Sequence, residues 1–132
     1  MVGILLLMHD PLAGAFKATV RHLFGNSQER FEAIDVQADQ DIAEVEALAR
    51  DAIARLDDGA GVLVLTDILG GTPANCCGQL KVETSSVEVL TGVSLPMLLR
   101  ALTYRNTDLE TMIAKALLGG KNGAVRIEPE LN

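Results

Sequence analysis

The sequence predicts an α/β domain in which a mostly parallel sheet is covered by helices on both faces. Aliphatic runs and helical patterns alternate along the 132 residues, which is typical of consecutive strand–helix–strand units. Residues 2–8 and 61–66 are apolar almost throughout, as expected of strands that are buried on both faces. The chain is 48% hydrophobic and 22% charged, which is enough apolar material for a single domain over residues 1–132. Only 3% of the residues are aromatic, so the core must consist of aliphatic side chains.

The first elements are a strand and a helix. Residues 2–8 (VGILLLM) form a continuous aliphatic run that predicts the first strand. From Pro11 onward, apolar residues recur at helical spacing, and Gly25 supplies a stop because glycine readily takes the left-handed conformation of a helix C-cap. His22 lies within this helix and is expected at the surface.

A second strand and a second helix follow. Residues 31–36 form a short strand pattern. Asp39 or Asp41 then opens a helix, since aspartate is a preferred N-cap, and one apolar face of this helix continues to Leu56.

The second half of the chain completes the sheet. Residues 61–66 and 87–91 predict the third and fourth strands, each followed by a loop and a helix. The last helix covers about residues 107–118, and the glycine pair at 119–120 ends it. Residues 123–128 can then add one edge strand. We therefore expect a doubly wound, four-stranded sheet of strand order 2-1-3-4 plus that edge strand.

Composition excludes several classes of function. With 11 Lys and Arg against 18 Asp and Glu, the net charge of −7 argues against nucleic acid as a partner. No apolar run approaches the roughly 20 residues that span a bilayer, so no direct membrane insertion is expected. Cys76 and Cys77 are adjacent and offer neither a disulfide framework nor metal-ligand spacing. We expect a cytoplasmic protein without a metal site or another cofactor.

Two candidate functional residues follow strands that are expected to be neighbours. In open α/β sheets, sites lie beyond the carboxyl ends of the strands, where the strand order reverses. With the order 2-1-3-4 this point lies between the first and third strands, which are followed by His9 and Asp67. A neutral imidazole is a good nucleophile near neutral pH, and a carboxylate on its other nitrogen fixes the tautomer and stabilises a positive ring. The alternatives are a turn histidine that caps a helix and an aspartate that caps the loop.

The loop after the third strand supplies phosphate-binding candidates. Gly70, Gly71 and Thr72 would let backbone amides approach a phosphoryl group at the start of a helix, where free N–H groups and the helix dipole attract anions. Asp10 and Thr72 are placed as N-caps of two helices that converge on this crevice. A histidine, a carboxylate and an amide cradle together suit a phosphoryl group that is carried on the imidazole.

Ile68 and Leu69 are apolar residues in the same loop. They could pack into the core or form a docking surface for a protein partner, and we favour docking. The chain has no obvious cluster of acids for Mg²⁺, so amides would have to neutralise the phosphate.

These motifs resemble the enzyme IIA components of the mannose class of the bacterial sugar phosphotransferase system. The resemblance rests on GILLLMHDPLAGAF around His9, VLVLTDILGGTPAN around Asp67 and VEVLTGVSLPMLLRAL, and it runs nearly end to end. It implies that His9 accepts a phosphoryl group from the phosphocarrier protein HPr and passes it to a IIB protein or domain. It also implies that Asp67 is the family aspartate and that Gly70, Gly71 and Thr72 form the phosphate-holding loop.

The resemblance further implies a homodimer in which an edge strand is exchanged between subunits, with residues 123–128 as the candidate. The sequence departs from the family pattern at two positions. Asp10 follows the histidine where the family usually has glycine, and Ala74 stands where an aromatic residue is common. Because His9 itself is retained, these departures are expected to affect the rate of phosphoryl transfer and the choice of protein partner.

Several functions remain open on the sequence alone. The domain could serve sugar uptake, act as a regulatory phosphoacceptor, or be the phosphoryl-donor subunit of dihydroxyacetone kinase, which shares this fold and histidine. A receiver-like signalling domain phosphorylated on Asp67 is a further alternative, although it would need paired acids after the first strand and a lysine after the fifth. A dinucleotide-binding module would need a glycine fingerprint after the first strand, which MHDPLAG does not supply.

Overall fold

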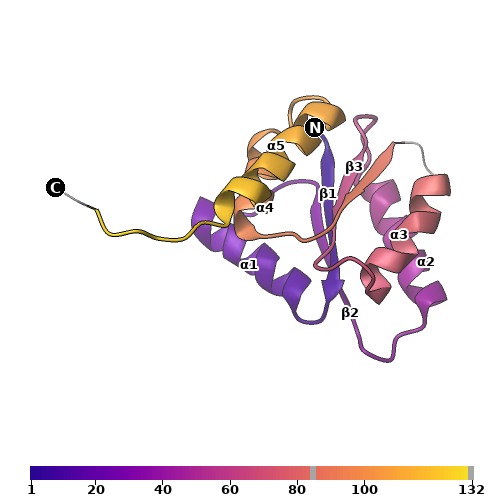
Figure 1. The fold of residues 1–132 in the computed structure, drawn as a ribbon. Coiled ribbons are helices and arrows are strands. Elements are labelled where there is room, and N and C mark those ends of the chain that lie inside the picture. The colour runs from indigo at the N-terminus through magenta and orange to yellow at the C-terminus, as the bar shows by residue number, and fades with distance from the viewer. Residues whose placement is uncertain (84–85, 131–132) are drawn as a thin grey trace.

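A parallel sheet forms the centre of the computed structural model, which describes residues 1–83 and 86–130. Its strands are β1 (Gly3–His9), β2 (Phe31–Val36), β3 (Val62–Leu65) and β4 (Val87–Leu90). Their order is β2-β1-β3-β4, and every neighbouring pair is parallel (Figure 1). The predicted four-stranded sheet of order 2-1-3-4 is therefore confirmed, and the carboxyl ends of all its strands lie along one edge.

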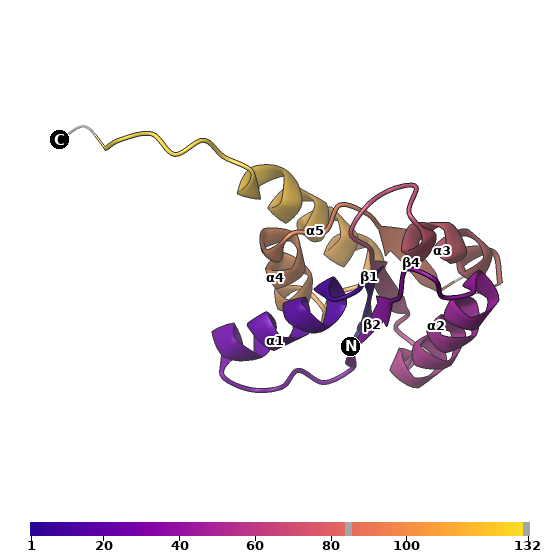
Figure 2. The same cartoon turned by 90° about the horizontal axis from the view of Figure 1, so that it is seen from below.

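Helices cover both faces of this sheet, as predicted. One layer consists of α1 (Leu12–Phe24), α4 (Leu95–Thr103) and α5 (Leu109–Gly123). The other layer consists of α2 (Ile42–Leu56) and α3 (Thr72–Glu83). Figure 2 shows the two layers on opposite sides of the strands. Each helix that follows a strand begins at the carboxyl edge of the sheet, so helix N-termini gather there.

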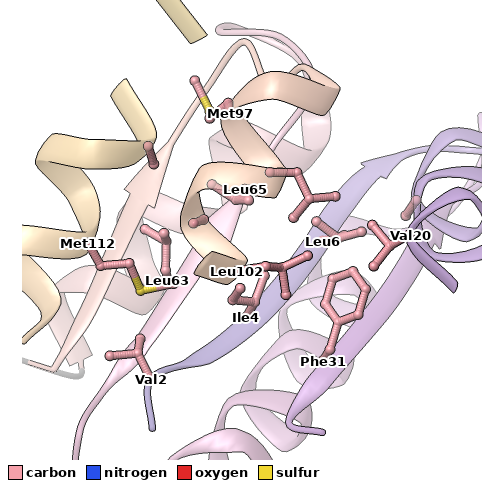
Figure 3. Packing of buried hydrophobic residues seen from close by; sticks show 14 of the residues in the cluster. Val2, Ile4, Leu6, Val20, Phe31, Leu63, Leu65, Met97, Leu102 and Met112 are labelled. Atoms are coloured by element: carbon pink, nitrogen blue, oxygen red, sulfur yellow. The ribbon is translucent and has the colours of Figure 1, made fainter. Parts of the chain in front are cut away.

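The strand β1 packs against both layers because successive side chains point to opposite faces. Ile4 and Leu6 point toward α1, α4 and α5, where they join Leu102 (Figure 3). Leu5 and Leu7 point toward α2 and α3. Each buried leucine or isoleucine stabilises the fold by about 1.5–3 kcal/mol relative to exposure. This two-sided burial explains why β1 has no polar position before its last residue.

Side chains at the N-termini fix where three of the helices begin. The Asp41 carboxylate accepts a hydrogen bond from the Ala43 backbone N–H at 3.1 Å, so Asp41 rather than Asp39 opens α2. Ser94 and Asp108 cap α4 and α5 in the same way, each accepting from a backbone amide three residues later. These caps satisfy amides that have no partner inside the helix.

Glycines end one helix and continue another. Gly25 ends α1 as predicted, with a left-handed φ of 79°. The prediction that Gly119 and Gly120 end the last helix is wrong, because α5 runs through both residues. A Cβ at Gly119 would lie 2.6 Å from Cγ of Arg100 and 2.8 Å from the Pro96 carbonyl oxygen, both in α4. Close helix packing therefore offsets the cost of about 1 kcal/mol that each glycine brings to a helix interior.

The predicted edge strand at residues 123–128 is not part of this chain's own sheet. Gly123 is the last residue of α5, and residues 124–130 have neither helical nor strand structure. This segment leads away from the body of the molecule (Figure 1), and Val125 and Ile127 are strongly exposed. Its alternating pattern predicts a half-buried strand, but it pairs with none of the four strands in the part of the chain that the structure describes.

Candidate functional site

His9 and Asp67 meet at the carboxyl edge of the sheet, between β1 and β3. His9 is the last residue of β1, and Asp67 follows β3 by two residues. The imidazole Nδ1 lies 2.7 Å from Oδ2 of Asp67. The backbone N–H of His9 also points to this oxygen, at 3.4 Å. The parallel pairing of β1 with β3 places both strand ends at one point, so the structure brings together the two side chains that the sequence pairs.

The contact with Asp67 determines which nitrogen of His9 is available. An ionised carboxylate can only accept hydrogen bonds, so in the neutral imidazole Nδ1 carries the proton and Nε2 keeps its lone pair. None of the described residues forms a hydrogen bond to Nε2. The His9 side chain is 44% exposed and the Asp67 side chain 14% exposed. Nε2 is therefore the ring nitrogen with an available lone pair, and the carboxylate behind the ring can stabilise positive charge on it.

Gly71 lies against the reactive edge of the imidazole. A Cβ at this position would lie 2.6 Å from Cε1 and 3.2 Å from Nε2 of His9. No side chain larger than a hydrogen atom fits between the loop and the ring. The neighbouring Gly70 has a φ of 88°, a left-handed conformation that glycine adopts without strain.

Two predicted N-caps at this edge are wrong. Asp10 does not cap α1. Pro11 occupies the N-cap position, and no side chain at that position forms a capping hydrogen bond. Thr72 does not cap α3, because it is already the first helical residue and follows Gly71. A glycine has no side chain, so it leaves the first amides of α3 without a cap. The described side chains elsewhere do not supply one.

Asp35, in β2, caps α1 from a distance. Its Oδ1 accepts a hydrogen bond from the Ala13 N–H at 2.8 Å, and both of its oxygens approach the Gly14 N–H, at 3.3 and 3.2 Å. Sequence reasoning missed this residue. The signal was a carboxylate near the carboxyl end of a strand, where a partly buried charge needs a partner. Asp35 thus occupies the N-terminus of α1, whereas none of the described carboxylates takes this place at the start of α3.

A comparison with sequence models of protein families gives one decisive match. The model described as "PTS system fructose IIA component", EIIA-man, matches residues 3–117. The chain belongs to this family. The match includes β1 with His9, the loop after β3 and all of α4, so it covers every candidate site residue.

Individual relatives of this EIIA-man domain agree. The mannose-specific EIIAB component of the PTS system from Escherichia coli K12 is 30% identical over 132 residues, 97% of this chain but 41% of that protein. The chain thus spans about two-fifths of the length of the mannose-specific relatives it matches. The sorbose-specific EIIA component from Lacticaseibacillus casei is 30% identical, over 84% of this chain and 80% of that protein. Among solved structures, the EIIA component from Streptococcus agalactiae superposes with a TM-score of 0.86 at 27% identity, covering 96% of this chain and 97% of that one.

Apolar side chains lie at the same edge of the sheet as the histidine of this EIIA-man domain. Ile68 and Leu69 are 57% and 79% exposed, so the alternative that they pack into the core is wrong. A shallow cavity of about 170 Å³ lies at the same edge of the molecule, between the start of α1 and the start of α4. Its lining residues are Leu12, Ala15, Phe16, Thr19 and Leu95. The helical spacing of the apolar residues after Pro11 does not by itself reveal such a groove.

Residues 1–83 and 86–130 contain neither a cluster of metal-binding side chains nor a membrane-spanning helix. Within this part of the chain, no three His, Cys, Asp or Glu side chains gather closely enough to hold a metal ion. The same residues contain no helix with both the length and the apolar character needed to span a bilayer. Cys76 and Cys77 are unpaired and buried, and both thiols donate to the Pro73 carbonyl oxygen.

Proposed function

We propose that His9 accepts a phosphoryl group on Nε2 from phospho-HPr and passes it to a IIB protein during sugar uptake. The observation that carries this proposal is the 2.7 Å contact between Nδ1 and Asp67, which leaves Nε2 unprotonated and exposed. Membership in the EIIA-man family supports the same role, since the mannose- and sorbose-specific relatives bear phosphotransferase-system names.

The proposed transfer exchanges one nitrogen–phosphorus bond for another. The lone pair of Nε2 attacks the phosphorus of the donor phosphohistidine, and the bond to the donor nitrogen breaks as the donor imidazole leaves. The His9 ring keeps its proton on Nδ1 and becomes cationic. Asp67 stabilises this cation and holds the ring in one orientation, which is the role of a carboxylate behind a catalytic histidine. Passing the group to IIB reverses these steps.

The loop before α3 is the proposed phosphate cradle. Gly71 lets the loop approach Nε2, and the uncapped start of α3 at Thr72 presents amides to the same place. Gly70 permits the turn that brings these amides into position. Because the transition state of phosphoryl transfer is loose, positioning and neutralisation of charge suffice for catalysis.

Ile68 and Leu69 are the proposed contacts for the protein partners. Their exposure beside an accessible histidine favours docking, since large apolar side chains gain free energy when a partner covers them. HPr and the IIB protein must reach the same nitrogen, so they would use this surface in turn. The neighbouring cavity at Leu12, Phe16 and Leu95 enlarges it.

We also propose that the domain acts as a cytoplasmic homodimer. Val125 and Ile127 alternate with Arg126 and Glu128, as in a strand with one apolar face. Exchange of residues 123–128 between subunits would bury these exposed side chains on the partner's sheet. The two unpaired cysteines suit a reducing compartment.

Labelling with phosphoenolpyruvate, enzyme I and HPr tests the proposal. We expect an adduct that is acid-labile and stable in base, as a phosphohistidine is. The variant His9→Ala should remain unlabelled, while the matched variant His22→Ala, at an exposed position in α1, should label normally. Loss of the label in base would indicate an acyl phosphate on an aspartate instead. Either that result or labelling of His9→Ala would overturn the proposal.

A further inference from the structure

A second cavity lies on α1, away from His9. It has a volume of about 380 Å³ and is bounded by one side of α1 and by the connection from α1 to β2. The lining residues are Gly14, Lys17, Ala18, Val20, Arg21, Ser27, Gln28 and Phe31. None of them belongs to the site at His9. Because α1 runs back from the carboxyl edge and Phe31 is the first residue of β2, the cavity lies toward the amino end of β2.

The charges in this cavity are all positive. Lys17 and Arg21 are one helical turn apart on α1, so they lie on one face of the helix. Neither forms an ion pair with a described residue, and no acidic side chain lines the cavity. The nearby Asp35 carboxylate is already engaged by the amides at the start of α1. In a chain with a net charge of −7, two unpaired cations in one concavity are a local exception.

The dipole of α1 accounts for only part of this pattern. Arg21 lies in the last turn of α1, where a cation stabilises the helix. Lys17 lies a turn earlier and gains less from the dipole. The dipole also gives no reason for a hollow between the two cations and the loop that contains Ser27 and Gln28.

We propose that this cavity binds a small phosphate monoester with a hydroxyl-bearing body, such as a sugar phosphate. Lys17 and Arg21 would hold the dianionic phosphate, since guanidinium and ammonium groups form strong charge-assisted hydrogen bonds to phosphate oxygens. Ser27 and Gln28 would bond to hydroxyl groups, and Val20 and Phe31 supply an apolar floor. The volume is at the lower end of the range of ligand sites, which fits a ligand of this size. This proposal is independent of the phosphoryl transfer at His9.

The test is a titration of the full chain followed by amide chemical shifts in ¹H–¹⁵N NMR spectra. All titrations use the variant His9→Ala, so that the result for the cavity does not depend on any reaction at His9. The ligands are glucose 6-phosphate, inorganic phosphate and uncharged glucose. We expect saturable shifts of amides in residues 14–21 and 27–31 with glucose 6-phosphate, weaker binding of inorganic phosphate and none of glucose.

Substitutions identify the binding groups. The added changes Lys17→Ala and Arg21→Ala should weaken glucose 6-phosphate binding by at least about tenfold, because two charge-assisted hydrogen bonds are lost. The matched pair Lys121→Ala and Arg50→Ala removes the same charge from α5 and α2 and should leave the affinity unchanged. Equal weakening by both pairs, shifts confined to other residues, or equal affinity for inorganic phosphate would overturn the proposal.

Discussion

The helices α1 and α3 both follow a strand at the carboxyl edge of the sheet, yet their N-termini differ. The first amides of α1 donate to the Asp35 carboxylate, which comes from the neighbouring strand β2. The first amides of α3 follow Gly71 and receive no side-chain cap from the described residues. The other helices resemble α1, since Asp41, Ser94 and Asp108 cap α2, α4 and α5.

Under the proposed function, this difference reserves one helix among several for an anion. A helix N-terminus attracts negative charge, and an internal carboxylate removes that attraction by satisfying it. The start of α3 keeps this attraction for negative charge, and the close contact of Gly71 with the imidazole brings it beside Nε2 of His9. Capping everywhere else therefore favours a single location for a phosphoryl group.

The largest effect on the rate of phosphorylation is expected from Asp67→Asn. This substitution changes the hydrogen-bond partner of His9, which lies beside the uncapped start of α3. An amide side chain can donate as well as accept, so Nδ1 is no longer forced to carry the proton and the cationic ring loses its counter-charge. We expect the rate of His9 labelling by phospho-HPr to fall by about 10²- to 10⁴-fold, as for other catalytic histidines that lose a carboxylate partner. Rapid-quench labelling measures this rate.

The control for Asp67 is Asp10→Asn, which removes an exposed carboxylate next to His9 in the chain. This variant should change the rate by less than about tenfold, because Asp10 makes no contact with the imidazole and acts only through screened, exposed charge. Equal rates in Asp67→Asn and the unaltered protein would exclude Asp67 from the mechanism.

The second effect is expected from Gly71→Ala, which fills the contact between the α3 loop and the ring. The new Cβ would lie 2.6 Å from Cε1 of His9, so the loop or the imidazole must move. Misplacement by about 1 Å can cost up to 10²-fold in rate, and we expect a loss of about ten- to 100-fold in labelling. The control is Gly78→Ala in the same helix, where nothing lies within 4 Å of the added atom. If the two variants label at the same rate, the loop is not the phosphate cradle.

The sequence alone predicts most of the arrangement around His9. The apolar run in β1 requires burial on both faces, burial on both faces implies a parallel sheet, and parallel strands bring His9 and Asp67 to one edge. These steps depend on local pattern and on general rules of topology, so a single sequence suffices for them.

The features that the sequence does not predict depend on distant partners. The hydrogen bonds from the first amides of α1 to Asp35 depend on the register that pairs Met8 with Asp35. They also depend on the angle at which α1 leaves the sheet. The glycine pair in α5 is typical of a helix end, and only the close approach of α4 explains why the helix continues. Residues 123–128 have the pattern of a strand, but a pattern does not say which sheet a strand would join.

The third effect is a loss of stability, expected from Asp35→Ala, which removes the carboxylate that caps α1. Removing the carboxylate leaves the first amides of α1 unsatisfied, and we expect the free energy of unfolding to fall by about 1–2 kcal/mol. The control Asp39→Ala changes an exposed aspartate for which the described residues offer no partner, and should cost no more than about 0.5 kcal/mol. Urea unfolding monitored by circular dichroism gives both values.

The variant Asp35→Ala also tests the contrast between α1 and α3, because it converts α1 into a second uncapped helix. Inorganic phosphate should raise the urea midpoint of Asp35→Ala more than that of the unaltered protein, since a bound anion replaces the missing carboxylate. If phosphate stabilises both proteins equally, an open N-terminus at this edge is not sufficient to attract an anion.

The smallest effect concerns Asp108, which caps α5 with a side chain that can titrate. Hydrogen bonds from the Thr111 backbone N–H and from its hydroxyl hold the pKa of Asp108 below its ordinary value. The stabilisation is therefore complete above the pKa of an unfolded aspartate, about 3.9, and is lost as the pH falls through the lower folded pKa. Asparagine caps helices about as well but does not titrate. In urea unfolding series from pH 7 to pH 2, the difference in stability between the protein and Asp108→Asn should thus stay constant above about pH 4, and the protein should lose stability relative to the variant below it. Two curves that stay parallel over this interval would show that the charge on Asp108 contributes nothing to the cap, and that α5 resembles α3 more closely than its hydrogen bonds suggest.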